Sequence, residues 1–445
     1  MRTHKKLAAL LLVLIFSLSL VTMPYAQTDL SAITDPNLIA EAMGEEFAEN
    51  YFRATELFNN FYDSLLQSRI GDIIYPDNFG GIYINDYGNL VVLVVGSAGT
   101  RANTSFIEAY VDSSVAIREV AFAYNDLWHT FRFLQNEMIS NRECSAIANV
   151  TGIWLDVIGN QVYITLDDYS DEHVANIGNM VEDSHILAFM HVPRIRTGDE
   201  YISHSPPIEY SHAKDISLED YAISPFTPGV IRPGDCIYLR HPTNSNAFTR
   251  VGTVGYRAQA DVPGAGNQHG FVTAAHIGWN VFGRYLRAGD NLYDSSRRLV
   301  GTVTASQRSS IDAAFVRQAP GALVTDVVHY GRIMPQRYRS TALGTVVITD
   351  TTRNGRTGRA GVIRGHWFGE DAHGFQVSGV RATFAVQPGD SGAIVYTWHR
   401  SGDNGVQGIV IASWPTSSWP DGGNALYSLA LNHIMMFPGD NPRPR

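Results

Sequence analysis

The sequence predicts two halves of different fold class, an α+β region followed by an all-β region. Short β-branched segments separated by Gly, Asn, Asp and Pro run through residues 236–437, a pattern typical of an all-β barrel or sandwich. Helical apolar spacing alternates with strand hairpins before residue 205. The net charge changes sign as well, from −21 over residues 28–225 to +8 over residues 226–445. Segments of opposite charge can attract each other, although two domains with unrelated surfaces are the alternative.

Composition sets broad limits on the protein. The chain has 445 residues, enough for two or three domains and a large core. The arginines of the basic half are scattered and form no runs, so we expect no nucleic-acid partner. Two cysteines, Cys144 and Cys236, fall in different halves and define no disulfide framework. We expect each to be a buried or weakly exposed free thiol.

Residues 1–26 have the features of a signal peptide. Three basic residues within the first six precede an apolar run over residues 7–21, and small residues follow up to Ala26. The apolar run is too short for a membrane span, and an uncleaved anchor is the alternative. We therefore expect a secreted, extracellular protein with no stable membrane association after signal cleavage.

Residues 27–205 are predicted to form an α+β region with a duplicated helix–hairpin unit. A helix is expected over residues 37–69, and a second helix after residues 112–114, which can cap it. The hairpins at residues 81–94 and 152–164 match without a gap at a shift of 71 residues; a chance match is the alternative. The histidines have no metal-ligand spacing, so we expect neither a metal nor a cofactor and assign structural or surface roles to His129, His173, His185 and His191.

A proline-rich linker joins the two halves. Residues 206–235 contain five prolines and little periodicity, so we expect an extended connection that proteases can reach. Processing is expected within it. The all-β domain then covers residues 236–437, and residues 438–445 form a flexible tail.

Three places in the all-β half carry groups suited to acyl transfer. An apolar strand ends at His276, whose imidazole can accept and return a proton near neutral pH. Asp312 lies within an apolar segment, where a carboxylate needs a partner such as an imidazole N–H. Ser391 follows as the candidate nucleophile. Each residue alone has an ordinary explanation (a core histidine, a turn aspartate, a turn serine), but the order His, Asp, Ser in one β-rich half is far more specific.

Glycines flank the candidate nucleophile on a turn. Ser391 needs a base and backbone N–H groups directed at the developing oxyanion. Gly389 lets the chain orient those N–H groups, and Gly392 leaves space behind the serine. A surface turn is the alternative. The α/β-hydrolase elbow Gly-x-Ser-x-Gly is excluded because Ala393 occupies its last position.

These motifs resemble those of the chymotrypsin-like serine peptidases, in particular the bacterial secreted branch of alpha-lytic protease and the streptogrisins. The similar segments are residues 273–276 (Thr-Ala-Ala-His), 312–316 (Asp-Ala-Ala-Phe-Val), 354–362 and 388–392 (Pro-Gly-Asp-Ser-Gly). The acidic half resembles the pro-regions of this branch. The resemblance implies an all-β double β-barrel with a His276–Asp312–Ser391 triad between the barrels. It also implies an oxyanion hole made by the Gly389 and Ser391 amides, and a pro-region that assists folding and inhibits until cleaved.

The sequence departs from this branch at several positions. Ile277 and Ala360 stand where the relatives commonly have Cys, so their disulfides are not expected here, and Ala393 replaces a usual Gly. By resemblance, Ala385 would form the floor of the substrate pocket and the segment Val410 to Ser413 its wall. The lack of an acid at Ala385 argues against cleavage after Arg or Lys, and we expect a medium or large apolar residue. An acidic preference served by His433 or His399 is the alternative.

Together these features predict a secreted serine endopeptidase made as a zymogen. It would hydrolyse peptide bonds in polypeptide substrates through an acyl-enzyme, with its own pro-region as a partner. One alternative is a non-catalytic exported binding protein on a protease fold. Another makes the acidic half an independent adhesive module.

Overall fold

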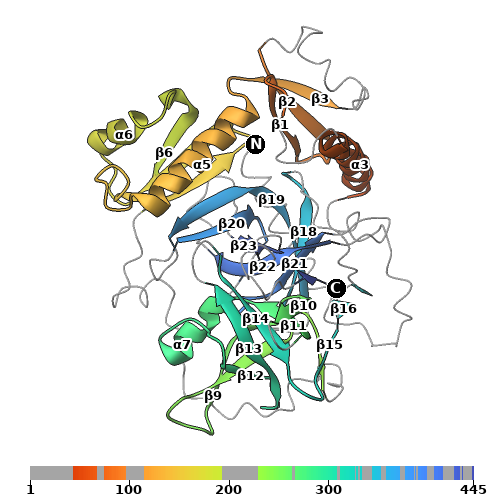
Figure 1. Cartoon of the computed structure of the whole chain (residues 1–445). Coiled ribbons are helices and arrows are strands. Elements are labelled where there is room, and N and C mark those ends of the chain that lie inside the picture. Colours follow the sequence, from red (N-terminus) through yellow and green to blue (C-terminus); the bar gives the residue numbers. More distant parts are fainter. Residues whose placement is uncertain are drawn as a thin grey trace.

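The structure is a computed structural model. It describes residues 44–67, 75–96, 115–192, 229–262, 266–307, 311–325, 327–328, 331–332, 343–351, 357–370, 376–384, 386, 389–397, 405–413, 425–430, 433 and 443–444. The predicted signal peptide and residues 206–228 of the predicted linker lie outside the described residues. Figure 1 shows two N-terminal units at one end of the molecule, strands β18 to β23 in the middle and strands β9 to β14 at the other end.

The first N-terminal unit is one helix packed on a three-stranded sheet. Strands β1 (Phe79–Ile84) and β2 (Leu90–Val95) form the predicted antiparallel hairpin, and β3 (Ala116–Val120) adds in parallel to β2. Helix α3 (Glu45–Gln67) lies within the range predicted for it and buries Phe47, Tyr51, Phe58 and Phe61. The helical periodicity of the sequence therefore identifies the face that packs against the hairpin.

The second N-terminal unit repeats the first. Its strands are β4 (Val150–Asp156), β5 (Gln161–Leu166) and β6 (Leu187–His191), and each begins 71 residues after its counterpart. As in the first unit, the first two strands are antiparallel and the third adds in parallel. Helix α5 (Tyr124–Ser140) packs on this sheet, while α6 (Asp171–Gly178) and the 3-10 turn η2 (Ser184–Ile186) lead into β6. The similarity of the hairpins thus extends to a third strand.

The predicted start of the second helix is wrong. Residues 116–120 form strand β3, and α5 begins at Tyr124 after Ala123, which provides no side-chain cap. The predicted helix would include Ile117 on its buried face, but Ile117 is exposed. Pairing with β2 satisfies the backbone groups of this segment, and local periodicity cannot show such a long-range partner.

The prediction that each cysteine is buried or weakly exposed is wrong for Cys144. Cys144 is exposed, Cys236 is partly buried, and both are free thiols. Cys144 lies in the turns after α5, beyond the helix face that packs on the sheet.

The strands nearest the linker form an eight-stranded sheet in the order β24-β10-β11-β14-β13-β12-β8-β9. Its strands are β8 (Cys236–Arg240), β9 (Phe248–Thr253), β10 (Arg257–Val262), β11 (Gly266–Thr273), β12 (Asn291–Tyr293), β13 (Leu299–Gln307), β14 (Ala313–Gln318) and β24 (Arg443–Pro444). Between them lie only the short turns η4 (Ala275–Gly278) and α7 (Trp279–Phe282) among the described helices. The all-β prediction is therefore confirmed for this part. Closure of this sheet into a barrel stays a prediction.

The remaining strands form a six-membered ring with an extension. The order β18-β21-β22-β23-β20-β19 is closed by an additional pairing of β18 with β19. These strands are β18 (Val346–Thr351), β19 (Thr357–Glu370), β20 (Gln376–Ala382), β21 (Ile394–Thr397), β22 (Gly405–Ser413) and β23 (Ala425–Leu429). The short pairs β7 (Val230–Ile231) with β15 (Leu323–Val324) and β16 (Val327–Val328) with β17 (Gly331–Arg332) complete the described strands.

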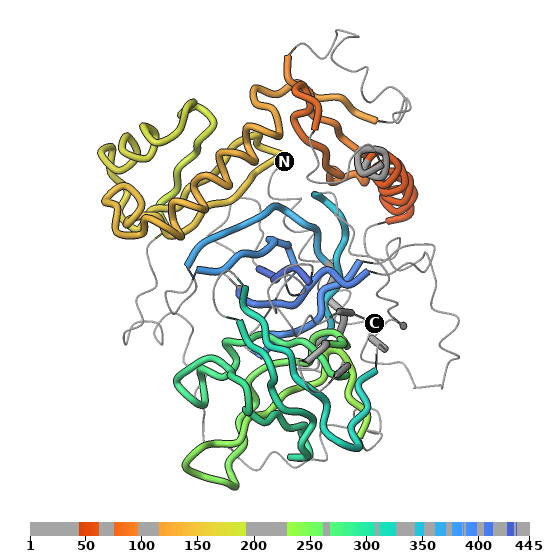
Figure 2. The backbone as a smooth tube through the Cα atoms, in the orientation of Figure 1, coloured from red at the N-terminus to blue at the C-terminus, as the bar shows by residue number. Residues whose placement is uncertain are grey.

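The second N-terminal unit continues the sheet of the C-terminal half. Strand β4 pairs antiparallel with β19, so that β4, β5 and β6 extend the ring strands into a nine-stranded sheet. Apolar side chains of both regions share one buried cluster, which includes Leu127, Ile164, Phe368 and Tyr427. Figure 2 shows the blue C-terminal strands lying between the orange-to-yellow N-terminal units and the green strands.

Candidate active site

Two of the three predicted catalytic side chains come from the eight-stranded sheet. Strand β11 ends at Thr273, and the η4 turn that follows carries His276. Asp312 directly precedes β14, and β11 and β14 are paired neighbours. The His276 backbone N–H donates to Asp312 Oδ1 at 2.9 Å. Strand pairing therefore brings together two residues that are 36 positions apart.

The side chains of His276, Asp312 and Ser391 form one hydrogen-bonded chain. His276 Nδ1 contacts Asp312 Oδ2, and His276 Nε2 lies 2.8 Å from Ser391 Oγ. Asp312 is buried, while His276 is partly exposed. An ionised carboxylate can only accept, so Nδ1 carries a proton and Nε2 can accept the hydroxyl proton of Ser391. The structure thus joins the three predicted residues across the two sheets.

Two backbone N–H groups at the turn before Ser391 have no acceptor among the described residues. Gly389 has φ +95° and Gly392 has φ +90°, values that favour glycine. The N–H groups of Gly389 and Ser391 donate no hydrogen bond to any described group. The Gly392 N–H, by contrast, donates to the Val410 carbonyl at 2.8 Å. Two free donors next to a serine hydroxyl are what stabilisation of an oxyanion requires.

Strand β9 fixes the position of this turn. The Thr253 N–H donates to the Ser391 carbonyl at 2.8 Å, and Thr253 Oγ1 donates to the Gly389 carbonyl at 2.8 Å. Thr253 is completely buried. The sequence gives no sign of this role for Thr253, because nothing in a β-branched strand segment signals a partner more than 130 residues away.

The predicted substrate-binding residues are placed only in part. Ala385 lies outside the described residues. Val410 is buried in the core shared with the N-terminal half, and its backbone bonds to Gly392 and Ala393. Ser413 ends β22, and its side chain lies outside the described atoms. The assignment of these residues to a substrate pocket stays a prediction.

His433, considered above for an acidic preference, is completely buried. Its Nδ1 lies 2.7 Å from Tyr256 Oη, and its Nε2 lies 2.9 Å from Ser428 Oγ. Burial lowers the pKa of His433 to about 3, although the Asp312 charge opposes this. A neutral imidazole with both nitrogens engaged links the two sheets and offers no free donor to a substrate. His399 lies outside the described residues.

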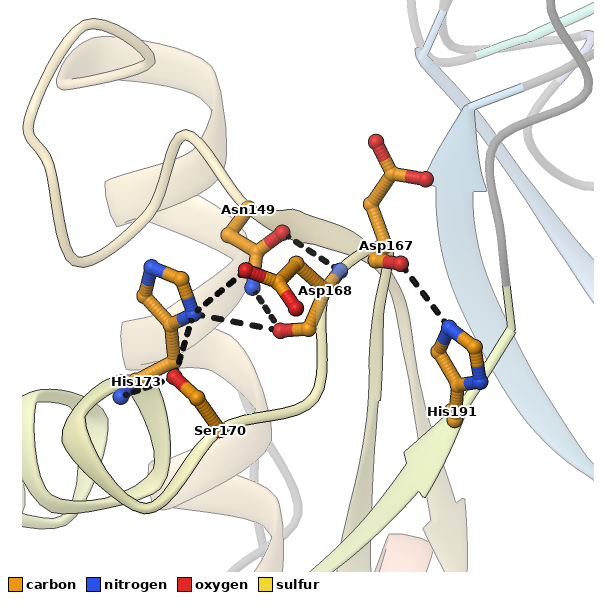
Figure 3. Close-up of polar contacts among 6 residues, drawn as sticks. All are labelled: Asn149, Asp167, Asp168, Ser170, His173 and His191. Atoms are coloured by element: carbon orange, nitrogen blue, oxygen red, sulfur yellow. Dashed lines mark hydrogen bonds and ion pairs between the residues drawn. The ribbon is translucent and has the colours of Figure 1, made fainter.

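Histidines of the N-terminal half make local contacts. His173 Nδ1 lies 2.9 Å from Ser170 Oγ and 3.1 Å from the Asp168 carbonyl, at the start of α6. His191 Nε2 lies 3.0 Å from the Asp167 carbonyl (Figure 3). These bonds hold the loop after β5 against α6 and β6. His129 and His185 are exposed.

The described residues contain no group of three or more His, Cys, Asp or Glu side chains placed to hold a metal ion. No helix within them has the length and apolar character needed to cross a membrane.

The fold and site define a strand-rich protein with a Ser–His–Asp cluster between two sheets, behind a duplicated α+β region. Residues 43–120, which include the whole first N-terminal unit, match the family described as the Pro-like N-terminal domain. No curated protein matches the chain.

Among solved structures the chain is similar to bacterial chymotrypsin-like proteases. Cellulomonas bogoriensis chymotrypsin is 20% identical over 48% of this chain and 98% of its own, with a TM-score of 0.35. Thermobifida fusca protease A is 23% identical over 48% of this chain and 100% of its own, with a TM-score of 0.36. Nocardiopsis protease is 23% identical over 48% of this chain and 99% of its own, with a TM-score of 0.36.

Proposed function

We propose that the protein is a secreted serine endopeptidase made as a zymogen. The observation that carries this proposal is the 2.8 Å contact between His276 Nε2 and Ser391 Oγ, with Asp312 on the other imidazole nitrogen. A base within hydrogen-bond reach of a hydroxyl, oriented by a third group, is the arrangement that activates a serine nucleophile.

In the first half of the proposed reaction, Ser391 Oγ attacks the carbonyl carbon of the scissile peptide while its proton moves to His276 Nε2. The resulting imidazolium is stabilised by Asp312 at Nδ1. The carbonyl oxygen becomes an oxyanion and accepts hydrogen bonds from the Gly389 and Ser391 N–H groups. When the C–N bond breaks, His276 returns the proton to the leaving amine, and the acyl group remains on Ser391.

In the second half, water replaces the leaving amine. His276 Nε2 takes a proton from the water as its oxygen attacks the acyl carbon. The new tetrahedral oxyanion uses the same two N–H groups. Its collapse breaks the ester bond, His276 protonates Ser391 Oγ, and a carboxylic acid product leaves.

The N-terminal half is proposed to act as a pro-region that assists folding and inhibits. Pairing of β4 with β19 and the shared apolar core support a folding role, because they satisfy an otherwise open strand edge and bury apolar surface of the C-terminal half. We infer from the resemblance of the acidic half to the pro-regions of secreted proteases that it inhibits the protease until the linker is cleaved.

The direct test is replacement of the nucleophile. Ser391→Ala should abolish hydrolysis of a peptide substrate and covalent labelling by a fluorophosphonate. Ser378→Ala, on β20, is the matched control and should retain both. Retained hydrolysis or labelling in Ser391→Ala would contradict the proposal, and an unlabelled wild-type protein after linker cleavage would favour the non-catalytic alternative.

The pro-region role is tested separately. The C-terminal half is expressed in three forms: alone, with residues 27–205 in the same chain, and with residues 27–205 added as a separate chain. We expect the yield of folded, active protein to fall sharply without them and to recover on addition in trans. Equal yields would make the N-terminal half an independent module.

A further inference from the structure

An arginine with two buried, unpaired donors lies beside the candidate oxyanion site. Arg250 is on β9, and its guanidinium lies 3.6–3.9 Å from the position that a Cβ on Gly389 would occupy. Its Nε and Nη2 are buried and have no hydrogen-bond partner among the described residues. The nearby Gly389 carbonyl already accepts from Thr253 Oγ1. The guanidinium therefore approaches the turn without bonding to it.

No described carboxylate forms an ion pair with Arg250, whose side chain is half-buried. Asp390, the next residue of the turn, is completely buried. Unsatisfied buried donors are costly. Stability therefore does not explain why an arginine occupies this position.

The strand that carries Arg250 is fixed to the turn. Thr253 holds the carbonyls of Gly389 and Ser391 through two hydrogen bonds of 2.8 Å. Gly252 lies so close to the turn that a Cβ there would be 2.8 Å from the Ser391 carbonyl oxygen. The backbone that carries Arg250 is thus fixed relative to the Gly389 turn, and a fixed charge needs little reorganisation when an oxyanion develops there.

We propose that Arg250 is a positioning residue whose unpaired positive charge, acting through the Gly389 turn, supports the oxyanion formed on attack by Ser391. A full charge that is partly shielded from solvent acts on a nearby negative charge more strongly than it would in bulk water. It acts on the transition state more than on the neutral peptide, because only the transition state carries the negative oxygen. This proposal rests on the endopeptidase function proposed above and adds a residue to it.

The variant that separates charge from fold is Arg250→Met. Methionine keeps an unbranched apolar stem, and replacing a buried charged group by an apolar one is often neutral or stabilising. Arg250→Lys restores the charge. Arg240→Gln is the matched control, because it removes one positive charge from an exposed residue of the neighbouring strand β8.

The proteins are produced from the full chain and processed, and active sites are counted with a fluorophosphonate. For Arg250→Met we expect kcat to fall about tenfold, less than the roughly 100- to 1,000-fold loss caused by removing a direct oxyanion donor. KM should change little, and the melting temperature should be unchanged or higher. The affinity for a peptide trifluoromethyl ketone, whose adduct places an oxyanion at this site, should fall by the same factor as kcat. Arg250→Lys should recover most of both, and Arg240→Gln should match wild type.

Three results would overturn the proposal. One is wild-type kcat in Arg250→Met. A second is a loss in kcat with unchanged ketone affinity and a lower melting temperature, which indicates a structural role. The third is an effect on KM confined to acidic peptides, which indicates substrate recognition. If wild type itself is inactive, the proposed function fails; if wild type is active and Arg250→Met equals it, only this inference fails.

Discussion

Trp154 of the N-terminal half lies opposite Trp367 of the C-terminal half in the β4–β19 ladder. Its ring stacks on Tyr163 at 4.3 Å, and the Arg381 guanidinium lies 5.1 Å from the ring centre. The equivalent residue of the first unit, Tyr83, forms a backbone bridge to Leu343. The two copies of the repeat therefore meet the C-terminal half at the same position of their first strand.

Replacement of Trp154 tests this contact. In the full-length Ser391→Ala chain, which cannot cleave itself under the proposed mechanism, Trp154→Ala should lower the free energy of unfolding by about 3–5 kcal/mol. The loss combines buried ring area with the contact to Arg381. Tyr169→Ala, at an exposed aromatic residue, should cost less than about 0.5 kcal/mol. Similar melting temperatures for the two variants would show that β4 contributes little to the assembly.

Acid should weaken the same interface through His366. This residue of β19 lies against Trp128 of α5, 5.8 Å between ring centres, and burial lowers its pKa to about 4. An unfolded histidine has a pKa of about 6.5, so the unfolded chain binds the proton more tightly. The contribution of the neutral His366 to the free energy of unfolding is therefore complete above pH 6.5. It is lost as the pH falls from 6.5 toward 4, which lowers the free energy of unfolding by at most about 3 kcal/mol.

The measurement is the free energy of unfolding of the Ser391→Ala chain at pH 8 and pH 5. His366→Gln should reduce the difference between the two values. His433, whose pKa is about 3, acts in the same direction and will leave part of the difference in place. His185→Gln, at an exposed site, should leave it unchanged, and an equal effect of both variants would exclude the interface as the source.

Asp312→Asn should reduce kcat by about 10,000-fold with little change in fold. The amide can donate where the carboxylate only accepts, so it favours the imidazole tautomer with its proton on Nε2. Asp294→Asn is a matched control just after strand β12 of the same sheet, where Asp294 is buried and binds Arg298. It should keep kcat per active site while lowering stability. Equal activity of the two variants would remove Asp312 from the mechanism.

Gly392→Ala should be far more damaging than Gly283→Ala. Both glycines have positive φ, which costs another residue roughly 1–2 kcal/mol. A Cβ on Gly392 would lie 2.2 Å from Thr273 Oγ1 and 2.4 Å from the Thr253 carbonyl, whereas one on Gly283 meets nothing within 4 Å. Thermal unfolding should show a loss above about 4 kcal/mol only at Gly392. Equal losses of stability in the two variants would mean that the turn around Ser391 can rearrange to accommodate a Cβ at little cost.

Much of the architecture follows from local pattern. The hairpins, the buried face of α3 and the short strands after residue 236 appear where period-2 and period-3.6 patterns place them. Local pattern does not predict strand β3, because its residues are mostly exposed and depend on β2 for pairing. Nor does it predict the closed ring of β18 to β23 or the extension of that ring by β4.

The amino-acid order alone singled out His276, Asp312 and Ser391 as candidate catalytic residues, because their flanking residues form recognisable short motifs. Only the tertiary structure decided that their side chains meet and that Thr253 is hydrogen-bonded to the turn that carries Ser391. It also decided that the guanidinium of Arg250 lies beside Gly389 with no ion-pair partner among the described residues. The physical reason is that motifs record local backbone requirements. Electrostatic surroundings and strand partners arise from groups brought together over more than 100 positions of chain, and no local pattern encodes them.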